Sequence, residues 1–277
     1  MRAGEEAVEQ PAVADLVDDR LDQRSLWHPL VVLPELAWML VLVFGYSLAR
    51  LSVVDPATGY RNAEHLWSLE RALHLPSEAA AQHVVLHWPV LLRVANEYYA
   101  SAHFPLTAVF LFWVYVFRHD AWRWVRNAMT IFTASSLIIE ALLPMAPPRL
   151  VPHFGMVDTG VALGQSVYPA KTDSGVANQF AAMPSVHVGW ALLVGLGVLL
   201  VARGAWRWAA LIHPVLTLAV VTVTANHYWS DGIVAGVLVA GALLVTRGAR
   251  RDAGQAAPER PDEPPMRERA ALPELSG

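Results

Sequence analysis

The sequence contains no cysteine, one lysine and few charged residues of any kind. Without cysteine, the chain has no disulfide, no thiol nucleophile, no thiolate zinc site and no iron–sulfur cluster. Charged residues make up 16% of the 277 residues, against about 25% in an average soluble domain. The net charge of −4 argues against a nucleic-acid-binding protein, which carries a basic surface. What remains is a chain that is 55% hydrophobic.

Both ends of the chain are polar, and its apolar residues gather in the middle. Residues 1–25 are acidic and lack an apolar run behind a basic start, so we expect no signal peptide there. Residues 248–277 mix arginine, glutamate and proline without apolar periodicity. Segments of such composition do not bury enough apolar surface to fold alone. We therefore expect a disordered acidic tail at 1–25, a membrane domain at 26–247 and a disordered C-terminal tail at 248–277.

Six apolar stretches approach the length of a membrane span, which is about 20 residues for about 30 Å of hydrocarbon. They are Leu30–Ala49, Tyr98–Phe117, Asn127–Leu143, Ser185–Ala202, Trp208–Ala225 and Trp229–Thr246. A helix in a soluble core shows polar positions on each turn, whereas Val188–Val201 has none. Several stretches need flanking residues to complete a span. The pattern predicts an all-α, polytopic membrane protein with a bundle of six transmembrane helices.

Arginines mark the expected cytoplasmic side. They precede the first stretch, lie between the second and third and between the fourth and fifth, and follow the sixth. Short cytoplasmic loops are enriched in basic residues, so we expect a multi-pass cell-membrane protein with both termini in the cytoplasm. The long connection after the first stretch then lies outside. Within it, residues 61–75 place Leu66, Leu69 and Leu73 on one face, which favours an interfacial helix in this first outer loop.

Two polar motifs at the outer ends of the fourth and sixth stretches contain histidines. Met-Pro-Ser-Val-His at 183–187 puts Ser185 and His187 at a helix N-terminus, where backbone N–H groups and the helix dipole bind anions. His227 and Asp231 lie four residues apart and share a helix face. The carboxylate can accept from one imidazole nitrogen and leave the other as a nucleophile or base. Taken alone, each motif also fits an ordinary helix start or capping pair.

Further polar residues are expected on the same outer face. Ala-Pro-Pro-Arg at 146–149 ends the third stretch, and the guanidinium of Arg149 can bind a phosphate in a bidentate way. Lys171 follows in the same loop and can add charge, although both residues also fit ordinary loop cations. Tyr99 and His103 lie near the outer end of the second stretch. An ionisable group at such depth is a functional candidate, and packing against a neighbour is the alternative.

Together these residues suit phosphoryl transfer through a phosphohistidine. In that scheme His227 attacks phosphorus, Asp231 orients its ring, and His187 protonates the departing alkoxide. Arg149 and helix N–H groups stabilise the oxygens of the transition state. The sequence has no cluster of carboxylates that suggests a metal. The predicted mechanism therefore uses neither a metal nor another cofactor.

The order Pro-Pro-Arg, Pro-Ser-x-His and His-x3-Asp resembles the type 2 phosphatidic acid phosphatase superfamily. The resemblance implies a six-helix core with its site at the membrane surface. It assigns phosphate binding to the first motif, the acid to His187, and the nucleophile pair to His227 and Asp231. We take the candidate substrate-binding residues to be Arg149, Ser185, Lys171, Tyr99 and His103.

Within that superfamily, the sequence is similar to the branch of the inositol phosphorylceramide synthases. The shared motifs are Tyr-Tyr-x3-His-Phe at 98–104, Ala-Pro-Pro-Arg at 146–149, the run from Asn178 to Trp190, and Asn-His-Tyr-x2-Asp at 226–231. The branch implies an inositolphosphotransferase-like reaction on a membrane lipid. The resemblance extends from about residue 62 to residue 245.

Four positions depart from the superfamily pattern. Leu142 stands where the first motif has a lysine, and Val220 and Val221 stand where the third has Ser-Arg. Val186 replaces the glycine of the second motif. Two cationic phosphate contacts are therefore missing. Their loss favours a phosphodiester substrate of lower charge, or transfer of the group to an alcohol.

The leading hypothesis is a membrane phosphatase or phosphotransferase that acts on a lipid phosphate ester at the outer face. The acceptor is water, or an alcohol or polyol. One alternative is a non-catalytic transporter or scaffold whose histidines cap helices, although the internal repeats and broken helices of transporters are not evident. Another is a vanadate-dependent haloperoxidase, a soluble class that is richer in phosphate-site cations. The sequence leaves the lipid, the acceptor and the oligomeric state open.

Overall fold

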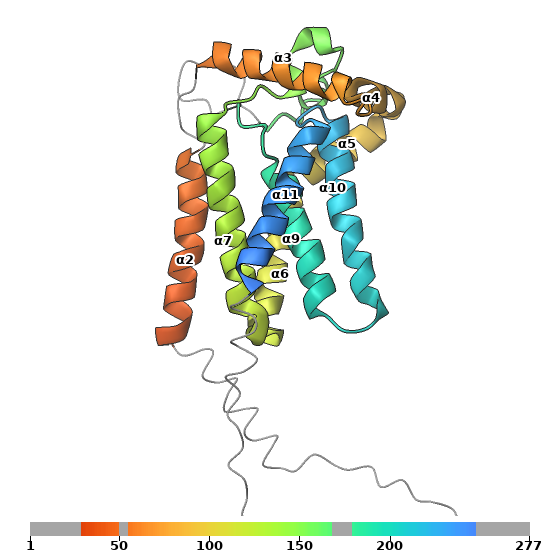
Figure 1. Ribbon diagram of the computed structural model, residues 1–277. Helices are drawn as coiled ribbons and strands as arrows, with labels where there is room; N and C mark the ends of the chain where they lie inside the picture. Colours follow the sequence, from red (N-terminus) through yellow and green to blue (C-terminus); the bar gives the residue numbers. More distant parts are fainter. Residues whose placement is uncertain (1–28, 50–54, 168–178, 248–277) are drawn as a thin grey trace, which may run out of the picture. The chain divides into compact units, whose positions relative to one another are not determined.

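The computed structural model describes residues 29–49, 55–167 and 179–247, and these residues form helices with no named strand (Figure 1). The all-α expectation is confirmed. The two predicted tails, 1–25 and 248–277, lie outside the described residues, as does Lys171. The chain divides into two compact units, Met1–Ser52 and Val53–Gly277. In the first unit, the described part is α2 (Pro29–Ala49), an apolar helix of 21 residues.

The second unit contains all the predicted site residues that the structure describes. Its helices are α3 (Pro56–Ala72), α4 (Glu78–Leu86), α5 (Pro89–Ser101), α6 (His103–Phe117), α7 (His119–Leu142), α8 (Thr159–Ala162), α9 (Val186–Val201), α10 (Ile212–Val223) and α11 (Trp229–Val245), with the 3-10 helices η1 (Pro148–Leu150), η2 (Pro152–Phe154) and η3 (Ala205–Leu211). α9 packs against α6, α7, α10 and α11. Figure 1 shows α3 lying across the end of this bundle where α7 and α10 finish and α11 begins.

Two glycines on α9 allow its neighbours to come close. A Cβ atom at Gly189 would overlap the ring of Phe132 on α7, and one at Gly197 would overlap the ring of Phe110 on α6. Both rings are buried, so neither can move aside without disturbing the core. These contacts fix the position of α9, whose second residue is His187.

The structure supports fewer spans than the sequence predicts. Among the described residues, one helix is long and apolar enough to cross a membrane: the continuous stretch Ala205–Val223, formed by η3 and α10. α5 and α6 count as a second span only if the pair is read as one helix with a 51° bend. The six predicted stretches do lie in helices, but α9 has 16 residues and α11 has 17. The six-span bundle therefore stays a prediction.

The helix expected at 61–75 is α3, and it begins earlier than predicted. The buried residues of this helix are Gly59, Ala63, Leu66 and Glu70. Leu69 is 53% exposed and Leu73 is 62% exposed, whereas Leu66 is buried. Of the three leucines predicted to share a face, Leu66 therefore belongs to the core and Leu69 and Leu73 to the surface of α3, and the interfacial position of this helix stays a prediction. The core-facing stripe repeats at seven-residue intervals and contains a carboxylate in place of a fourth apolar residue.

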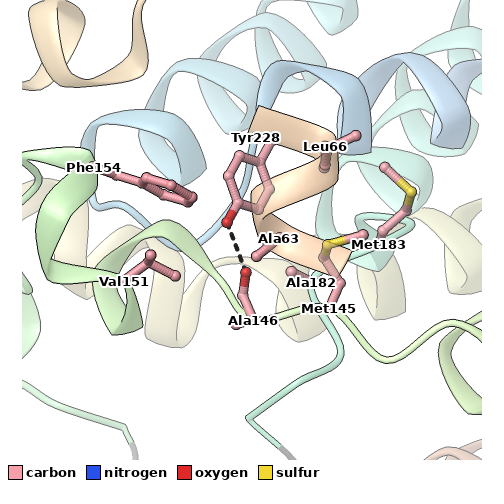
Figure 2. Packing of buried hydrophobic residues seen from close by; sticks show 9 residues of the cluster. All are labelled: Ala63, Leu66, Met145, Ala146, Val151, Phe154, Ala182, Met183 and Tyr228. Carbon is pink, nitrogen blue, oxygen red and sulfur yellow. Dashed lines mark hydrogen bonds between the residues drawn. The ribbon is translucent and has the colours of Figure 1, made fainter. Parts of the chain in front are cut away.

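A cluster of buried hydrophobic residues joins α3 to the three loops that carry the predicted motifs (Figure 2). Its members are Ala63, Leu66, Met145, Ala146, Val151, Phe154, Ala182, Met183 and Tyr228. The Tyr228 hydroxyl donates to the carbonyl oxygen of Ala146 at 2.8 Å. Burial raises the pKa of this hydroxyl, which keeps it protonated as a donor. The cluster thus holds the loops at 145–154, 182–183 and 228 together.

Candidate functional site

The imidazole of His227 is held from two sides. Its Nδ1 lies 2.7 Å from the carbonyl oxygen of Ala182 and 3.2 Å from Oδ2 of Asp231. Because both partners only accept hydrogen bonds, Nδ1 carries the ring proton and donates it. Nε2 then keeps its lone pair and is the nucleophilic nitrogen of the ring. Asp231 is fully buried, and its Oδ2 also accepts the backbone N–H of Tyr228 at 2.8 Å.

A tight turn between α10 and α11 sets the place of His227. Ala225 adopts a left-handed conformation with φ of 58°, which reverses the chain after α10. The N–H groups of Asn226 and His227 both donate to the carbonyl oxygen of Val221, at 3.0 and 3.2 Å. His227 therefore lies just before the first turn of α11, and its side chain reaches Asp231 within that turn.

His187 is the second residue of α9 and faces His227. The centroids of the two imidazole rings are 5.9 Å apart. Ser185 is the N-cap of α9, and its Oγ accepts the N–H of Val188 at 3.3 Å. The N–H of Ser185 in turn donates to the carbonyl oxygen of Asp231 at 3.3 Å, so the starts of α9 and α11 are tied together. Ser185 is fully buried, and in this structure its side chain caps a helix.

Two predicted residues from other helices surround the ring of His187. Tyr99 on α5 stacks on it, with ring centroids 4.5 Å apart and planes inclined by 25°. His103, the first residue of α6, has its ring centroid 4.6 Å from that of His187. The ring of His103 also stacks on that of Trp190, with the centroids 4.7 Å apart. Trp190 was not among the predicted site residues, although it belongs to the motif at 178–190.

Arg149 reaches the same region from η1. Its Nε donates to Oδ1 of Asn226 at 2.9 Å and its Nη1 to Oε1 of Gln179 at 3.2 Å. Oδ2 of Asp158 lies 3.7 Å from Nη1, so the guanidinium already has an anionic partner. The backbone N–H of Arg149 donates to the carbonyl oxygen of Ala225 at 3.0 Å. The arginine is therefore positioned by the residues that immediately precede His227.

Two small cavities adjoin these side chains, and Tyr99 borders both. One has a volume of about 10 Å³ and is lined by residues that include His103 and His187. The other has a volume of about 20 Å³ and is lined by residues that include Arg149 and Asn226. The larger cavity has room for about one water molecule. A phosphate group therefore requires side chains at this site to move apart.

Of the eight predicted site residues, the structure gathers seven at one end of the bundle. The eighth, Lys171, lies outside the described residues. Within the described ranges, no group of three or more His, Asp or Glu side chains is arranged to hold a metal ion.

Two carboxylates next to this site were not predicted from the sequence. Glu70 and Glu78 are fully buried, and both accept hydrogen bonds from the first turn of α11. A signal for Glu70 was present, because it continues the spacing of Ala63 and Leu66 on α3. No sequence pattern indicated the burial of Glu78, since an acidic residue in the first turn of a helix such as α4 is common at the surface.

A comparison with known families identifies the superfamily of the chain. The sequence model of the PAP2 superfamily matches residues 64–246, about two thirds of the chain. This range contains His187, His227, Asp231 and Arg149. Comparisons with curated proteins and with solved structures find no match. The resemblance to inositol phosphorylceramide synthases is narrower than this family match and stays a hypothesis. On the strength of the matched range, the chain belongs to the PAP2 superfamily.

Proposed function

We propose that this protein is an integral-membrane phosphatase or phosphotransferase that acts on a lipid phosphate ester through a phosphohistidine. Membership of the PAP2 superfamily supports a phosphatase-like activity and a lipid phosphate substrate. The mechanism rests on two observations. Nδ1 of His227 hydrogen-bonds both the carbonyl oxygen of Ala182 and the carboxylate of Asp231. The ring centroids of His227 and His187 are 5.9 Å apart. A nucleophile with a fixed tautomer and a nearby acid are the two groups that phosphoester cleavage needs.

In the first step, Nε2 of His227 attacks phosphorus. The N–P bond forms while the P–O bond to the lipid alcohol breaks, and the leaving oxygen takes a proton from His187. The ring of His227 becomes positively charged as its second nitrogen bonds to phosphorus. Asp231 and the Ala182 carbonyl stabilise that charge, because both already accept from Nδ1.

In the second step, an acceptor hydroxyl attacks the phosphohistidine. His187, now neutral, removes the proton of the acceptor, the P–N bond breaks, and its electron pair returns to Nε2. Water as the acceptor releases a phosphate, whereas an alcohol or polyol yields a new ester. The cavity beside Arg149 accommodates water, and a polyol requires that cavity to open wider.

Arg149 holds the phosphate oxygens in this scheme. A bound phosphate replaces Asp158 as the anion next to its guanidinium. Among the described residues that line the two cavities, Arg149 is the only arginine or lysine. Leu142 and Val221, which stand where superfamily motifs carry cations, add no charge. A site with one guanidinium favours a diester of lower charge over a dianionic monoester, or favours transfer over hydrolysis.

The experiment uses the full-length protein in detergent with phosphatidate, phosphatidylinositol, phosphatidylglycerol phosphate and a polyprenyl diphosphate. Released phosphate and new lipid species are followed by mass spectrometry, with and without a chelator and a polyol. The variants are His227→Ala and, as a matched control, His83→Ala, an exposed histidine of α4.

Phosphate release that His227→Ala abolishes indicates a phosphatase, and a new headgroup that appears without free phosphate indicates a transferase. Products that form equally in His227→Ala and the native protein contradict the phosphohistidine. No product from any lipid, with the protein folded, favours a non-catalytic membrane protein instead. Equal turnover of monoester and diester lipids removes the basis for a substrate of lower charge.

The membrane topology belongs to the same proposal: six spans, both termini cytoplasmic, and the site on the outer side. The absence of cysteine makes single-cysteine labelling straightforward. Val161→Cys, on the exposed surface of α8, and Arg203→Cys, between α9 and η3, lie on opposite predicted sides. An impermeant maleimide should label Val161→Cys in intact cells and Arg203→Cys only after permeabilisation. The reverse pattern contradicts the orientation.

A further inference from the structure

Two carboxylates from outside the bundle meet the first turn of α11. Oε1 of Glu70 accepts the backbone N–H of Ser230 at 2.8 Å and its hydroxyl at 2.7 Å. Oε1 of Glu78 accepts the backbone N–H of Trp229 at 3.4 Å. The first N–H groups of a helix have no partner within the helix. At α11 these partners come from α3 and α4, which are far away in the sequence.

The turn that these carboxylates hold is the one that carries the proposed catalytic pair. Asp231 follows Ser230 directly, and His227 lies two residues before Trp229. A change in the start of α11 therefore moves Asp231 against the ring of His227. It also disturbs the hydrogen bond from Ser185 N–H to the Asp231 carbonyl, which ties α11 to α9.

The charges around the two carboxylates do not balance when both are ionised. Glu70 and Glu78 are fully buried. Their cationic neighbour is Arg71, whose Nη2 lies 3.0 Å from Glu78 Oε2 and 3.9 Å from Glu70 Oε2. Asp231 adds a third buried carboxyl in the same first turn of α11. Of the helices that pack against α4, α10 carries His213, which hydrogen-bonds with the Tyr98 hydroxyl, and α5 carries Arg93 and Glu97, which are both exposed.

A proton shared by the two carboxyls resolves this imbalance. Burial and the hydrogen-bonded carboxyl of Glu70 raise the pKa of Glu78 to about 7. Oε2 of Glu70 is buried, and none of the described residues donates a hydrogen bond to it. A proton on Glu78 supplies one donor to the two carboxyls, which lie next to the same Arg71 guanidinium, and lowers the buried negative charge by one.

We propose that Glu70 and Glu78 are positioning residues that hold the first turn of α11 through a carboxyl pair carrying one proton, and so keep Asp231 and His227 aligned. This inference rests on the proposed function, because alignment matters only if the two residues catalyse. Neither glutamate touches the reacting atoms. Loss of the shared proton leaves an uncompensated negative charge beside Asp231, which disturbs the pair and lowers kcat as the pH rises.

The first test compares Glu78→Gln with Glu78→Ala in the lipid assay across a range of pH. Glutamine keeps an oxygen for the N–H of Trp229, and its amide group donates to Glu70 in place of the proton. We expect Glu78→Gln to keep kcat near neutral pH and to lose the alkaline fall in kcat. Glu78→Ala should lower kcat about tenfold or more with little change in KM, since alignment and not binding is impaired.

The matched control is Glu64→Gln, which removes a carboxylate of the same helix α3 that pairs with His153 at the surface. It should leave the pH profile of kcat unchanged. A profile that is the same in Glu78→Gln and the native protein overturns the proposal. If Glu78→Gln does not fold, Arg71→Gln replaces it, since Arg71 is partly exposed. Loss of that cation should move the alkaline fall upward by about 1 pH unit, and no movement overturns the proposal.

Infrared spectroscopy tests the proton without any substrate. The native protein should show the C=O stretch of a buried protonated carboxylic acid at neutral pH, and the band should disappear at alkaline pH and be absent from Glu78→Gln. A native spectrum without this band overturns the shared proton. If no lipid is turned over by any form, the proposed function fails, and the spectrum still decides whether the carboxyl pair exists.

Discussion

The phenol ring of Tyr99 stacks on the imidazole of His187, with centroids 4.5 Å apart. The two residues come from α5 and α9, and Tyr99 also borders the small cavity that Arg149 lines. One aromatic ring thus contacts the proposed general acid and borders the same cavity as the proposed phosphate-binding arginine. Since stacking restrains the plane of the imidazole, we expect Tyr99 to set the direction of proton donation in the proposed acid role of His187.

Substitution of Tyr99 tests this role of the ring. Tyr99→Phe keeps the stacked face and should retain most of the activity. Tyr99→Leu removes the stack and should lower kcat about tenfold or more, because a misdirected acid is costly even when displaced by a fraction of an ångström. Steady-state kinetics with the preferred lipid provide the measurement. Equal losses in both variants would show that the hydroxyl, and not the stack, is what matters.

The acid role of His187 predicts a dependence on the leaving group. In His187→Ala, esters with an alkyl alcohol should lose about 10²-fold or more in rate, because the alkoxide leaves without a proton. An aryl phosphate ester needs less protonation, so its first step should be less affected. Its second step still lacks the base, and acid-labile phosphoprotein should therefore accumulate. Equal losses for alkyl and aryl esters, with no phosphoprotein, would contradict this role.

Asp231→Asn should lower kcat less than His227→Ala does. The tautomer of His227 is held mainly by the Ala182 carbonyl, whose oxygen lies closer to Nδ1 than Asp231 Oδ2 does. The variant therefore loses the stabilising charge but keeps the nucleophilic nitrogen, and we expect a loss of about 10²- to 10³-fold, below the about 10⁴-fold loss typical of a wrong tautomer. Single-turnover rates measure it. Complete loss, equal to that of His227→Ala, would mean that Asp231 sets the tautomer.

The packing of α9 predicts opposite effects for two glycine substitutions. Gly189→Ala forces a methyl group into the ring of Phe132 and should lower the free energy of unfolding by about 1 to 3 kcal/mol. Gly241→Ala on α11 meets no atom within 4 Å and should raise it by about 0.5 to 1 kcal/mol through helix propensity. Thermal unfolding in detergent measures both. A neutral Gly189→Ala would contradict the close contact of α9 with α7.

The stability of the fold should also depend on Glu78. Its pKa is raised from 4.5 to about 7, so between these pH values the folded chain binds more protons than the unfolded chain. The free energy of unfolding should therefore fall as the pH rises through this window, by about 1.4 kcal/mol per pH unit at most. Below the window, where both states are protonated, the penalty is absent. Chemical unfolding of the native protein and of Glu78→Gln at matched pH isolates the effect, and parallel curves would contradict it.

Much of the fold follows from local patterns in the sequence. Apolar runs predicted the positions of six helices, because helix formation depends on residues within a few turns of one another. The motifs around Arg149, His187 and His227 were recognisable for the same reason, since each is short and contiguous. Spacing also predicted that His227 and Asp231 interact, because residues four apart share a helix face. Such local relations are the part that the sequence alone determined.

Contacts between distant segments were decided only by the tertiary structure. The oxygen that fixes Nδ1 of His227 belongs to Ala182, 45 residues away, and backbone carbonyls have no signature in a sequence. The stacking of Tyr99 on His187 depends on how α5 meets α9, which no periodicity encodes. Glu70 continues the buried spacing of α3, but its carboxylate can be buried only because the start of α11 supplies donors that compensate for its loss of water. Burial of a polar group is permitted by its partners, and those partners are assembled only when the chain folds.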